Sequence, residues 1–144
     1  TGDGGLQLNI QELATIQHNK IPIKIFIFNN QGYLTIKQTQ QLGFEGRIMG
    51  ADKKSGLTFP NYKKISESHK IKYFKFKSNK NLKSNIKKVI SSKNSSICEL
   101  VMDPNEEQIP KAINYRSLDG KVVPTKYEDM YPFLPRKEIE ENKF

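Results

Sequence analysis

The run Ile23–Phe28, with the sequence IKIFIF, constrains the fold more than any other stretch of this 144-residue chain. Only Lys24 is polar, and the other residues are β-branched or aromatic, as is typical of strands. Apolar side chains at nearly every position are expected where a strand is covered on both faces, as in a parallel sheet flanked by helices. The run therefore predicts a central parallel strand.

Helical and strand-like patterns alternate around this run. Residues from about Leu6 to His18 carry apolar side chains at helical spacing, and Pro22 marks the break. A glycine-rich region from Asn30 to Asn61 predicts a loop, with one short helix near Leu34 to Leu42. The pattern then predicts two further helices and two strands, in chain order a helix near Tyr62–His69, a strand near Lys72–Phe76, a helix near Asn81–Ser92 and a strand near Ile97–Met102. We therefore expect an α/β fold, a parallel sheet with helices on both faces.

The last 40 or so residues differ from the rest because prolines recur after Asp103, at positions 104, 110, 124, 132 and 135. Proline lacks a backbone N–H and interrupts regular elements, so long helices and strands are not expected here. We predict a domain over residues 1–103 and a proline-rich tail over 104–144 that packs on this domain or on a partner subunit.

The formal net charge of +9 raises the possibility of a nucleic-acid ligand. However, nearly all of the positive charge is lysine rather than the arginine favoured for phosphate and base recognition. In the stretch IKYFKFK the lysines alternate with apolar residues, as in a half-buried strand with one solvated face. A basic module that binds anions or nucleic acid remains an alternative function.

The sequence contains no run of apolar residues long enough to span a membrane and no secretion signal. Cys98, the single cysteine, lies in the apolar run SICELVM and has no disulfide partner in the chain. We expect it to behave as a small core residue in a reducing cytoplasm. His18 and His69 stand at the ends of predicted helices, without a partner at metal-ligand spacing.

Chemistry-bearing residues gather at Gly2–Gly5 and Asn29–Asn30. Ligands of parallel α/β sheets bind at the carboxyl ends of the strands, where free backbone N–H groups face an anion. The Asp3 carboxylate would repel a bare phosphate, but a divalent cation between the two removes this conflict. Asp3, the Asn30 side chain and the Gly32 carbonyl could supply its oxygen ligands. The alternative is that Gly2–Gly5 form a tight turn and the asparagines cap the next segment.

The sequence Gly2-Asp3-Gly4, followed by 24 residues and then Asn29-Asn30, resembles the thiamine diphosphate motif of the pyruvate decarboxylase and acetolactate synthase superfamily. The resemblance continues through GGLQLNIQELATI, NNQGYLTIKQTQ and SGLTFPNYKKIS to the tail YEDMYPFLP, and is greatest to acetolactate synthase-like proteins found with surface-sugar biosynthesis genes.

The resemblance implies a role for each matching residue. Asp3, Asn30 and the Gly32 carbonyl would hold Mg²⁺. Gly2, Gly4 and Gly5 would contact the diphosphate of thiamine diphosphate. Three apolar residues would lie near the thiazolium ring or the substrate, namely Tyr33, Leu34 and Ile36. The alternative is that these residues belong to the core.

The implied activity is the decarboxylation of a 2-keto acid such as pyruvate and the transfer of the two-carbon unit to an acceptor. Yeast-type pyruvate decarboxylases carry a glutamate where Ile36 stands here, and Ile36 cannot donate a proton. Carboligation is therefore expected, with simple 2-keto acid decarboxylation as the alternative.

The resemblance also implies partners for this chain. In the family the glutamate that activates the cofactor comes from a separate pyrimidine-binding domain, usually on another subunit, and a strand precedes the first glycine of the motif. Neither is visible here, where only Thr1 precedes Gly2. We therefore expect this chain to be the C-terminal, cofactor-binding part of a longer polypeptide. The part alone is expected to be inactive, and the intact enzyme is expected to work as a homodimer or tetramer.

Overall fold

The computed structural model describes residues 1–116 and 119–142. The chain forms two compact units, Thr1–Glu106 and Glu107–Phe144. The first unit contains, in chain order, α1 (Asp3–Gln7), α2 (Glu12–His18), β1 (Lys24–Asn29), α3 (Leu34–Gly43), the 3₁₀ turn η1 (Lys53–Ser55), α4 (Tyr62–Ser68), β2 (Lys72–Phe76), α5 (Leu82–Ile90) and β3 (Ser96–Val101).

A three-stranded parallel sheet in the order β1-β3-β2 forms the centre of the first unit. In this sheet β3 lies between the other two strands, and its residues from Ser96 to Glu99 are all buried. In β1, Ile27 is fully buried while Phe28 is 48% exposed. The predicted parallel sheet is confirmed, and the central position belongs to the last strand rather than to Ile23–Phe28.

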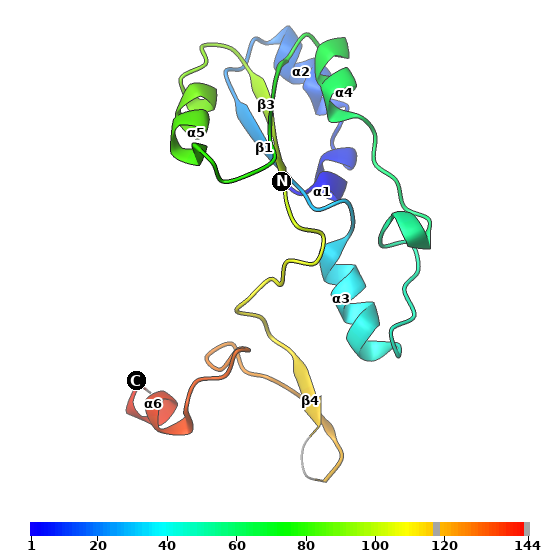
Figure 1. The fold of residues 1–144 in the computed structure, drawn as a ribbon, viewed down its shortest axis with the longest axis vertical. Coiled ribbons are helices and arrows are strands. Elements are labelled where there is room, and N and C mark those ends of the chain that lie inside the picture. Colours follow the sequence, from blue (N-terminus) through cyan, green and yellow to red (C-terminus); the bar gives the residue numbers. More distant parts are fainter. Residues whose placement is uncertain (117–118, 143–144) are drawn as a thin grey trace. The chain divides into compact units, whose positions relative to one another are not determined.

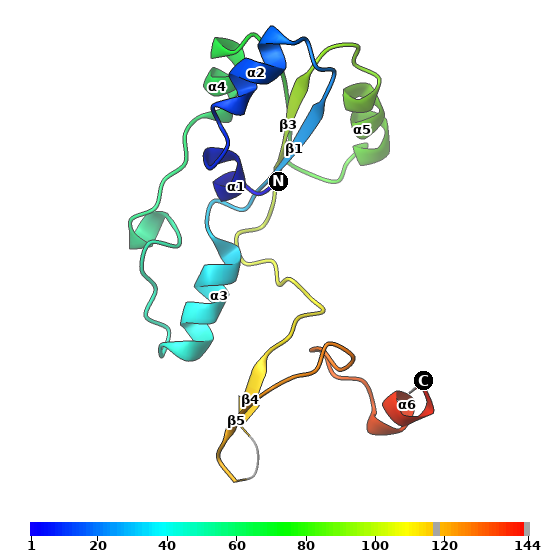
Figure 2. The same cartoon turned by 180° about the vertical axis from the view of Figure 1, so that it is seen from behind.

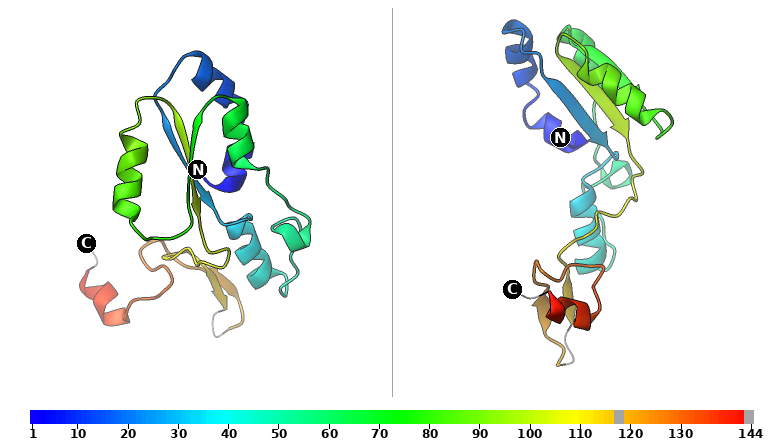
Figure 3. Two further views of the ribbon diagram at one scale, coloured as in Figure 1. Left: turned by 45° about the horizontal axis from the view of Figure 1, so that its top comes forward. Right: turned by 90° about the vertical axis from the view of Figure 1, so that its left-hand side faces the viewer.

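Helices cover both faces of this sheet. Figure 1 shows α5 on one face and α1, α2 and α4 on the other, and Figure 2 shows the same arrangement from behind. The face with three helices holds the main core, which consists of Leu6, Leu13, Ile27, Tyr62, Ile71 and Ile97. Figure 3 shows α5 alone on the opposite face, where its Val89 is fully buried. The predicted α/β fold with helices on both faces is therefore confirmed.

The single helix expected from Leu6 to His18 is wrong, because the structure has two shorter helices, α1 and α2, joined by a turn. In this turn Asn9, Glu12 and Leu13 each donate a backbone N–H to the carbonyl three residues earlier. The change of direction lets Leu6 and Leu13 both reach the core while Leu8 stays 78% exposed. Tertiary packing therefore overrides the helical periodicity of the segment.

Thr1 and Gly2 lie beside the carboxyl end of β1. The Thr1 amino group donates to the Phe26 carbonyl, and the Phe28 N–H donates to the Thr1 carbonyl, both at 2.9 Å. Gly2 thereby pairs with Phe28 in a parallel bridge. This pairing brings the next residue, Asp3, to the edge of the sheet where β1 ends.

The predicted loop region with one short helix is confirmed, since α3 covers Leu34–Gly43. The 3₁₀ turn η1 was not predicted. Its first residues are held by a capping box, in which the Asp52 side chain accepts from the Ser55 N–H and the Ser55 side chain accepts from the Asp52 N–H. This turn lies close to the segment after β1, because the Tyr33 N–H donates to the Ala51 carbonyl at 2.8 Å.

The second unit contains the antiparallel strands β4 (Asn114–Arg116) and β5 (Val122–Pro124) and the helix α6 (Arg136–Glu141). No element in it exceeds six residues in the part of the chain that the structure describes. The expectation of short elements in the proline-rich tail is therefore confirmed. Across the described residues of both units, none of the helices has the length and apolar character needed to cross a bilayer.

Candidate functional site

Asp3 is the centre of the candidate site, with only 3% of its surface exposed. Its carboxylate accepts the N–H of Gly4 at Oδ1, at 2.8 Å, and the N–H of Gly32 at Oδ2, at 3.2 Å. The second bond joins segments that are 29 residues apart in sequence. The structure thus brings together three residues that the sequence predicted to share one site.

Burial raises the pKa of the Asp3 carboxyl above its ordinary value. Backbone N–H groups of Gly4, Gly32, Gln31 and Asn30 lower the pKa, but burial outweighs them. A buried carboxylate that is poorly compensated by its surroundings is an energetic cost in the absence of a positive partner. A cation beside Asp3 would remove that cost.

The Asn30 side chain supplies a second oxygen. Its Oδ1 atom is buried and has no hydrogen-bond partner among the described residues. Buried carbonyl oxygens are nearly always paired, so an unpaired one calls for an explanation such as a bound ion. A hard divalent cation accepts carboxylate and amide oxygens alike. Asp3 and Asn30 therefore fit the ligands expected for Mg²⁺.

This donor set contains a single carboxylate. The described residues contain no group of three or more His, Cys, Asp or Glu side chains that could hold a metal ion. A metal bound here would depend on Asp3 together with neutral oxygens, and on oxygens of a ligand. Mg²⁺ commonly binds through one or two carboxylates plus substrate phosphates.

The turn that follows β1 has an uncommon conformation. Gln31 has a φ of 62°, in the left-handed region that non-glycine residues rarely adopt. The Asn29 Oδ1 atom accepts the Gln31 N–H at 3.0 Å. At Gly32 a Cβ atom would lie 2.6 Å from the backbone oxygen of Ala51, so only glycine fits without a backbone shift.

Two aromatic residues, Tyr33 and Tyr62, contact the Asp3-Gly4 segment. A Cβ atom on Gly4 would lie 2.0 Å from Cε1 of Tyr33, so the absence of a side chain at Gly4 lets the ring approach. The Tyr33 ring meets Phe59 edge to face at 5.8 Å between centroids. The Tyr62 hydroxyl donates to the Asp3 carbonyl at 3.0 Å, a contact that the sequence did not predict.

The two remaining glycines of the motif differ from each other. A Cβ atom on Gly2 would meet nothing within 4 Å. A Cβ atom on Gly5, which lies inside α1, would come within 2.6 Å of the Thr1 Oγ1 atom. Gly2 thus faces open space at the end of the sheet, while Gly5 packs against Thr1.

A cavity of about 260 Å³ lies beside the turn after β1. Asn30, Gly32 and Leu34 line it together with Asp52 and three lysines, namely Lys37, Lys53 and Lys54. Lys37 pairs with Asp52 at 3.3 Å, whereas Lys53 and Lys54 are exposed. Positive charge around a polar turn suits an anionic ligand such as a phosphate.

The structure places the three apolar candidates differently. Tyr33 packs against Gly4, Leu34 is 8% exposed and lines the cavity, and Ile36 is 47% exposed on α3. Cys98 is fully buried, and burial raises the pKa of its thiol to about 11, so it remains protonated at neutral pH.

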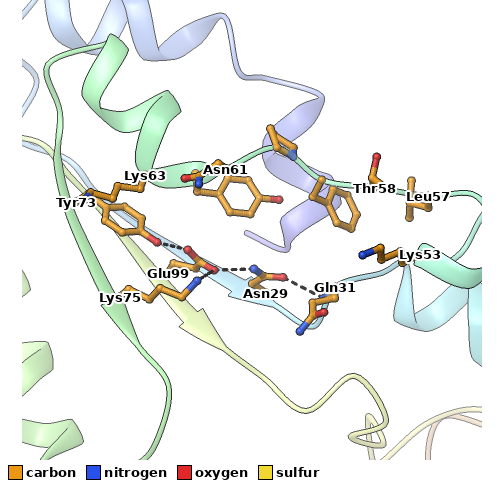
Figure 4. A pocket seen from close by; sticks show the side chains of 13 residues that line it. Asn29, Gln31, Lys53, Leu57, Thr58, Asn61, Lys63, Tyr73, Lys75 and Glu99 are labelled. Carbon is orange, nitrogen blue, oxygen red and sulfur yellow. Dashed lines mark hydrogen bonds and ion pairs between the residues drawn. The ribbon is translucent and has the colours of Figure 1, made fainter.

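Glu99 is a buried acid that the sequence analysis did not single out. It lies at the edge of a second cavity, of about 450 Å³, shown in Figure 4. Its carboxylate accepts hydrogen bonds from Asn29 and Lys75, both at 2.7 Å, and from the hydroxyl of Tyr73. Burial raises the pKa of Glu99, but these three hydrogen bonds outweigh it, and the pKa falls below its ordinary value. The signal in the sequence is one acid inside the apolar run SICELVM.

Comparison with known proteins agrees with these features. Residues 1–100 match the family described as "Thiamine pyrophosphate enzyme, C-terminal TPP binding domain". The acetolactate synthase large subunit of Cyanidium caldarium is 32% identical over 110 residues, which are 76% of this chain and 18% of that protein. The probable acetolactate synthase large subunit of Methanocaldococcus jannaschii is 32% identical over 143 residues, which are 99% of this chain and 23% of that protein.

A solved structure shares the fold. The thiamine diphosphate-dependent 4-hydroxybenzoylformate decarboxylase of Rhodococcus jostii RHA1 superposes with a TM-score of 0.63 at 18% identity. The match covers 72% of this chain and 19% of that one. This chain therefore spans about a fifth of the length of the proteins to which it is similar.

Proposed function

Because this chain belongs to the thiamine pyrophosphate enzyme family and matches the C-terminal cofactor-binding domain of that family, we propose that it helps to transfer a two-carbon unit from pyruvate to a carbonyl acceptor. The observation that carries the proposal is the Asn30 Oδ1 atom, which is buried without a hydrogen-bond partner among the described residues. It belongs to the turn whose backbone N–H groups face the buried Asp3 carboxylate. These two oxygens suit the Mg²⁺ that accompanies thiamine diphosphate in such enzymes.

Different residues would hold the metal ion and the diphosphate of the cofactor. The Asp3 carboxylate, the Asn30 Oδ1 atom and the Gly32 carbonyl would hold Mg²⁺. Backbone groups of Gly2, Gly4 and Gly5 would lie next to the diphosphate, because glycines allow an anion to approach the main chain closely. Lys53 and Lys54 add positive charge at the neighbouring cavity.

When bound, thiamine diphosphate supplies the electron sink that allows a 2-keto acid to lose carbon dioxide. Asp3 and Asn30 would orient the metal ion and the cofactor, and the surrounding chain would keep their environment buried and poor in water. Ile36 then bears on the outcome, since its side chain cannot deliver a proton to the two-carbon unit. General acid catalysis is worth about 10²–10⁴ in rate, so its absence at this position favours capture of the unit by a second carbonyl compound.

Two acceptor classes fit the resemblances. The relatives named acetolactate synthase suggest a second 2-keto acid, and the resemblance to proteins encoded with surface-sugar genes suggests a keto-sugar nucleotide. The glutamate that activates the cofactor is expected from a second copy or from a separate pyrimidine-binding domain. We therefore propose a homodimer or tetramer as the working assembly.

Labelled pyruvate tests the reaction in the natural polypeptide that carries this sequence. With thiamine diphosphate and Mg²⁺ present, mass spectrometry should find the labelled two-carbon unit joined to one of the two acceptors. Free acetaldehyde as the sole product, unchanged by either acceptor, would assign a simple decarboxylase instead. If the protein neither binds thiamine diphosphate nor consumes pyruvate, the basic anion-binding alternative would replace the proposal.

A further inference from the structure

Asn29 is the last residue of β1 and Asn30 follows it directly, yet the structure gives the two side chains different surroundings. The Asn29 Nδ2 atom donates to Glu99 Oε1 at 2.7 Å, whereas the Asn30 Oδ1 atom is buried and unpartnered among the described residues. Asn29 is therefore bound to Glu99, whereas the oxygen of Asn30 is available to the candidate metal site.

Glu99 fixes the orientation of the Asn29 amide. An ionised carboxylate only accepts hydrogen bonds, so it selects the NH₂ end of the amide. The oxygen end then faces the main chain, where it accepts the Gln31 N–H at 3.0 Å. Figure 4 shows this row of groups running from Glu99 through Asn29 to Gln31.

The Gln31 N–H lies in the turn that builds the metal site. The φ of 62° at Gln31 is a costly conformation that persists only where the surroundings hold it. The preceding residue is Asn30, and the following one is Gly32, whose N–H donates to Asp3. The bond from Gln31 to Asn29 therefore helps to fix both expected ligand residues of the turn.

We propose that Glu99 is a positioning residue for the metal site, acting through Asn29 on the turn that carries Asn30 and Gly32. The inference rests on the proposed function, because a metal at that site is part of it. In this role Glu99 would contact neither the metal nor the substrate. It sets the geometry of groups that do.

The surroundings of Glu99 suit such a role. It stands on the central strand β3, is 3% exposed, and is held from β2 by Lys75 at 2.7 Å and by the Tyr73 hydroxyl. Asn29 and Lys75 both donate to Oε1 of this carboxylate, whereas Tyr73 donates to Oε2. The oxygen that binds Asn29 therefore keeps both of its donors when Tyr73 is replaced. Residues that orient a metal ligand in this way commonly change metal affinity by 10–100-fold when they are replaced.

We call the contacts from Glu99 through Asn29 to Gln31 the relay. A swap of donor and acceptor tests the relay in the natural polypeptide that carries this sequence. Asn29→Asp places two carboxylates against each other, and we expect Mg²⁺ affinity at saturating thiamine diphosphate to fall by about 10–100-fold. The extra negative charge alone would strengthen cation binding, so a loss reports the broken hydrogen bond. Adding Glu99→Gln restores a donor–acceptor pair with the original net charge, and most of the affinity should return.

Tyr73→Phe is the matched control, because it removes one donor to Glu99 and leaves the bond to Asn29 intact. Its Mg²⁺ affinity should stay near that of the unmodified protein. If Asn29→Asp binds Mg²⁺ as tightly as the unmodified protein, or if the double variant binds no better than the single one, the relay is overturned. An equal loss in Tyr73→Phe would indicate general packing instead and would also overturn it.

Hydrogen exchange gives a readout that needs no metal. In the metal-free protein, Asn29→Ala should speed exchange at the amides of Gln31 and Gly32, and unchanged exchange there would contradict the inference. A different result would refute the proposed function, namely the absence of Mg²⁺-dependent binding of thiamine diphosphate by the unmodified protein. If the unmodified protein binds thiamine diphosphate with Mg²⁺ and the Asn29 variants bind Mg²⁺ equally well, only the positioning role of Glu99 is refuted.

Discussion

Gly32 donates its backbone N–H to the Oδ2 atom of Asp3 at 3.2 Å, although 29 residues separate the two. This bond joins the beginning of α1 to the turn after β1. It therefore links the glycine-rich start of the chain to the turn that follows the two asparagines. Changes on either side of it should therefore affect the same site.

Gly4→Ala should destabilise the metal-free protein by about 1–3 kcal/mol, the usual range for overpacking. A Cβ atom at this position would lie 2.0 Å from the Tyr33 ring, which must then move away from Gly4. Urea unfolding measures the change. Gly2→Ala is the control, because its Cβ atom meets nothing within 4 Å, and it should change stability by less than about 0.5 kcal/mol. Equal effects of the two substitutions would refute the close approach of Tyr33.

Ser55→Ala should cost about 1–2 kcal/mol of stability, as the loss of a cap does. The Ser55 Oγ atom accepts the N–H groups of Ala51, at 3.0 Å, and of Asp52, at 2.9 Å. Removing it leaves two N–H groups without this acceptor beside the turn that carries Gly32. Lys54→Ala, an exposed neighbour, should stay within about 0.5 kcal/mol. Urea midpoints of the two variants compare them directly, and a Ser55 variant as stable as the control would contradict the capping role.

Glu99→Gln should reduce stability at pH 7 by about 1–3 kcal/mol, the cost of losing hydrogen bonds to a charged group. The pKa of Glu99 in the folded protein lies below the ordinary value of 4.5. Its stabilising effect is therefore present above about pH 4.5 and is lost as the pH falls through the lower, folded-state pKa. The stability gap between the unmodified protein and the variant should narrow toward pH 3.

Denaturation curves at several pH values check this dependence. Glu67→Gln is the control, since Glu67 is exposed and pairs with exposed Lys63 at 3.7 Å, and exposed pairs contribute little. A gap for Glu99→Gln that stays constant from pH 7 to pH 3 would mean that its charge does not stabilise the fold.

The sequence was sufficient to predict the parallel α/β fold, because Ile23–Phe28 and the run around Cys98 are apolar on both faces. The spacing of Asp3 and Asn30 predicted the family, and the match of residues 1–100 confirms it. Apolar runs and motif spacing are read directly along the sequence, so they can be found without a structure.

Other features depended on contacts that are distant in sequence. The break between α1 and α2 follows from the need of Leu6 and Leu13 to reach one core, which periodicity alone does not indicate. The Tyr62 bond to Asp3 spans 59 residues, and the Asn29 bond to Glu99 spans 70. No local pattern specifies such pairs, and only the acid within an apolar strand marked Glu99 as unusual.

Calorimetric titration of thiamine diphosphate into the natural polypeptide that carries this sequence, with and without Mg²⁺, measures directly whether Asp3 and Asn30 form the metal and cofactor site. We predict Mg²⁺-dependent binding that Asp3→Ala and Asn30→Ala each weaken strongly, while Asn94→Ala, an exposed asparagine away from the site, leaves it unchanged. Binding of equal strength without Mg²⁺, or undiminished binding by the Asp3 and Asn30 variants, would contradict the assignment of these residues as the metal and cofactor site.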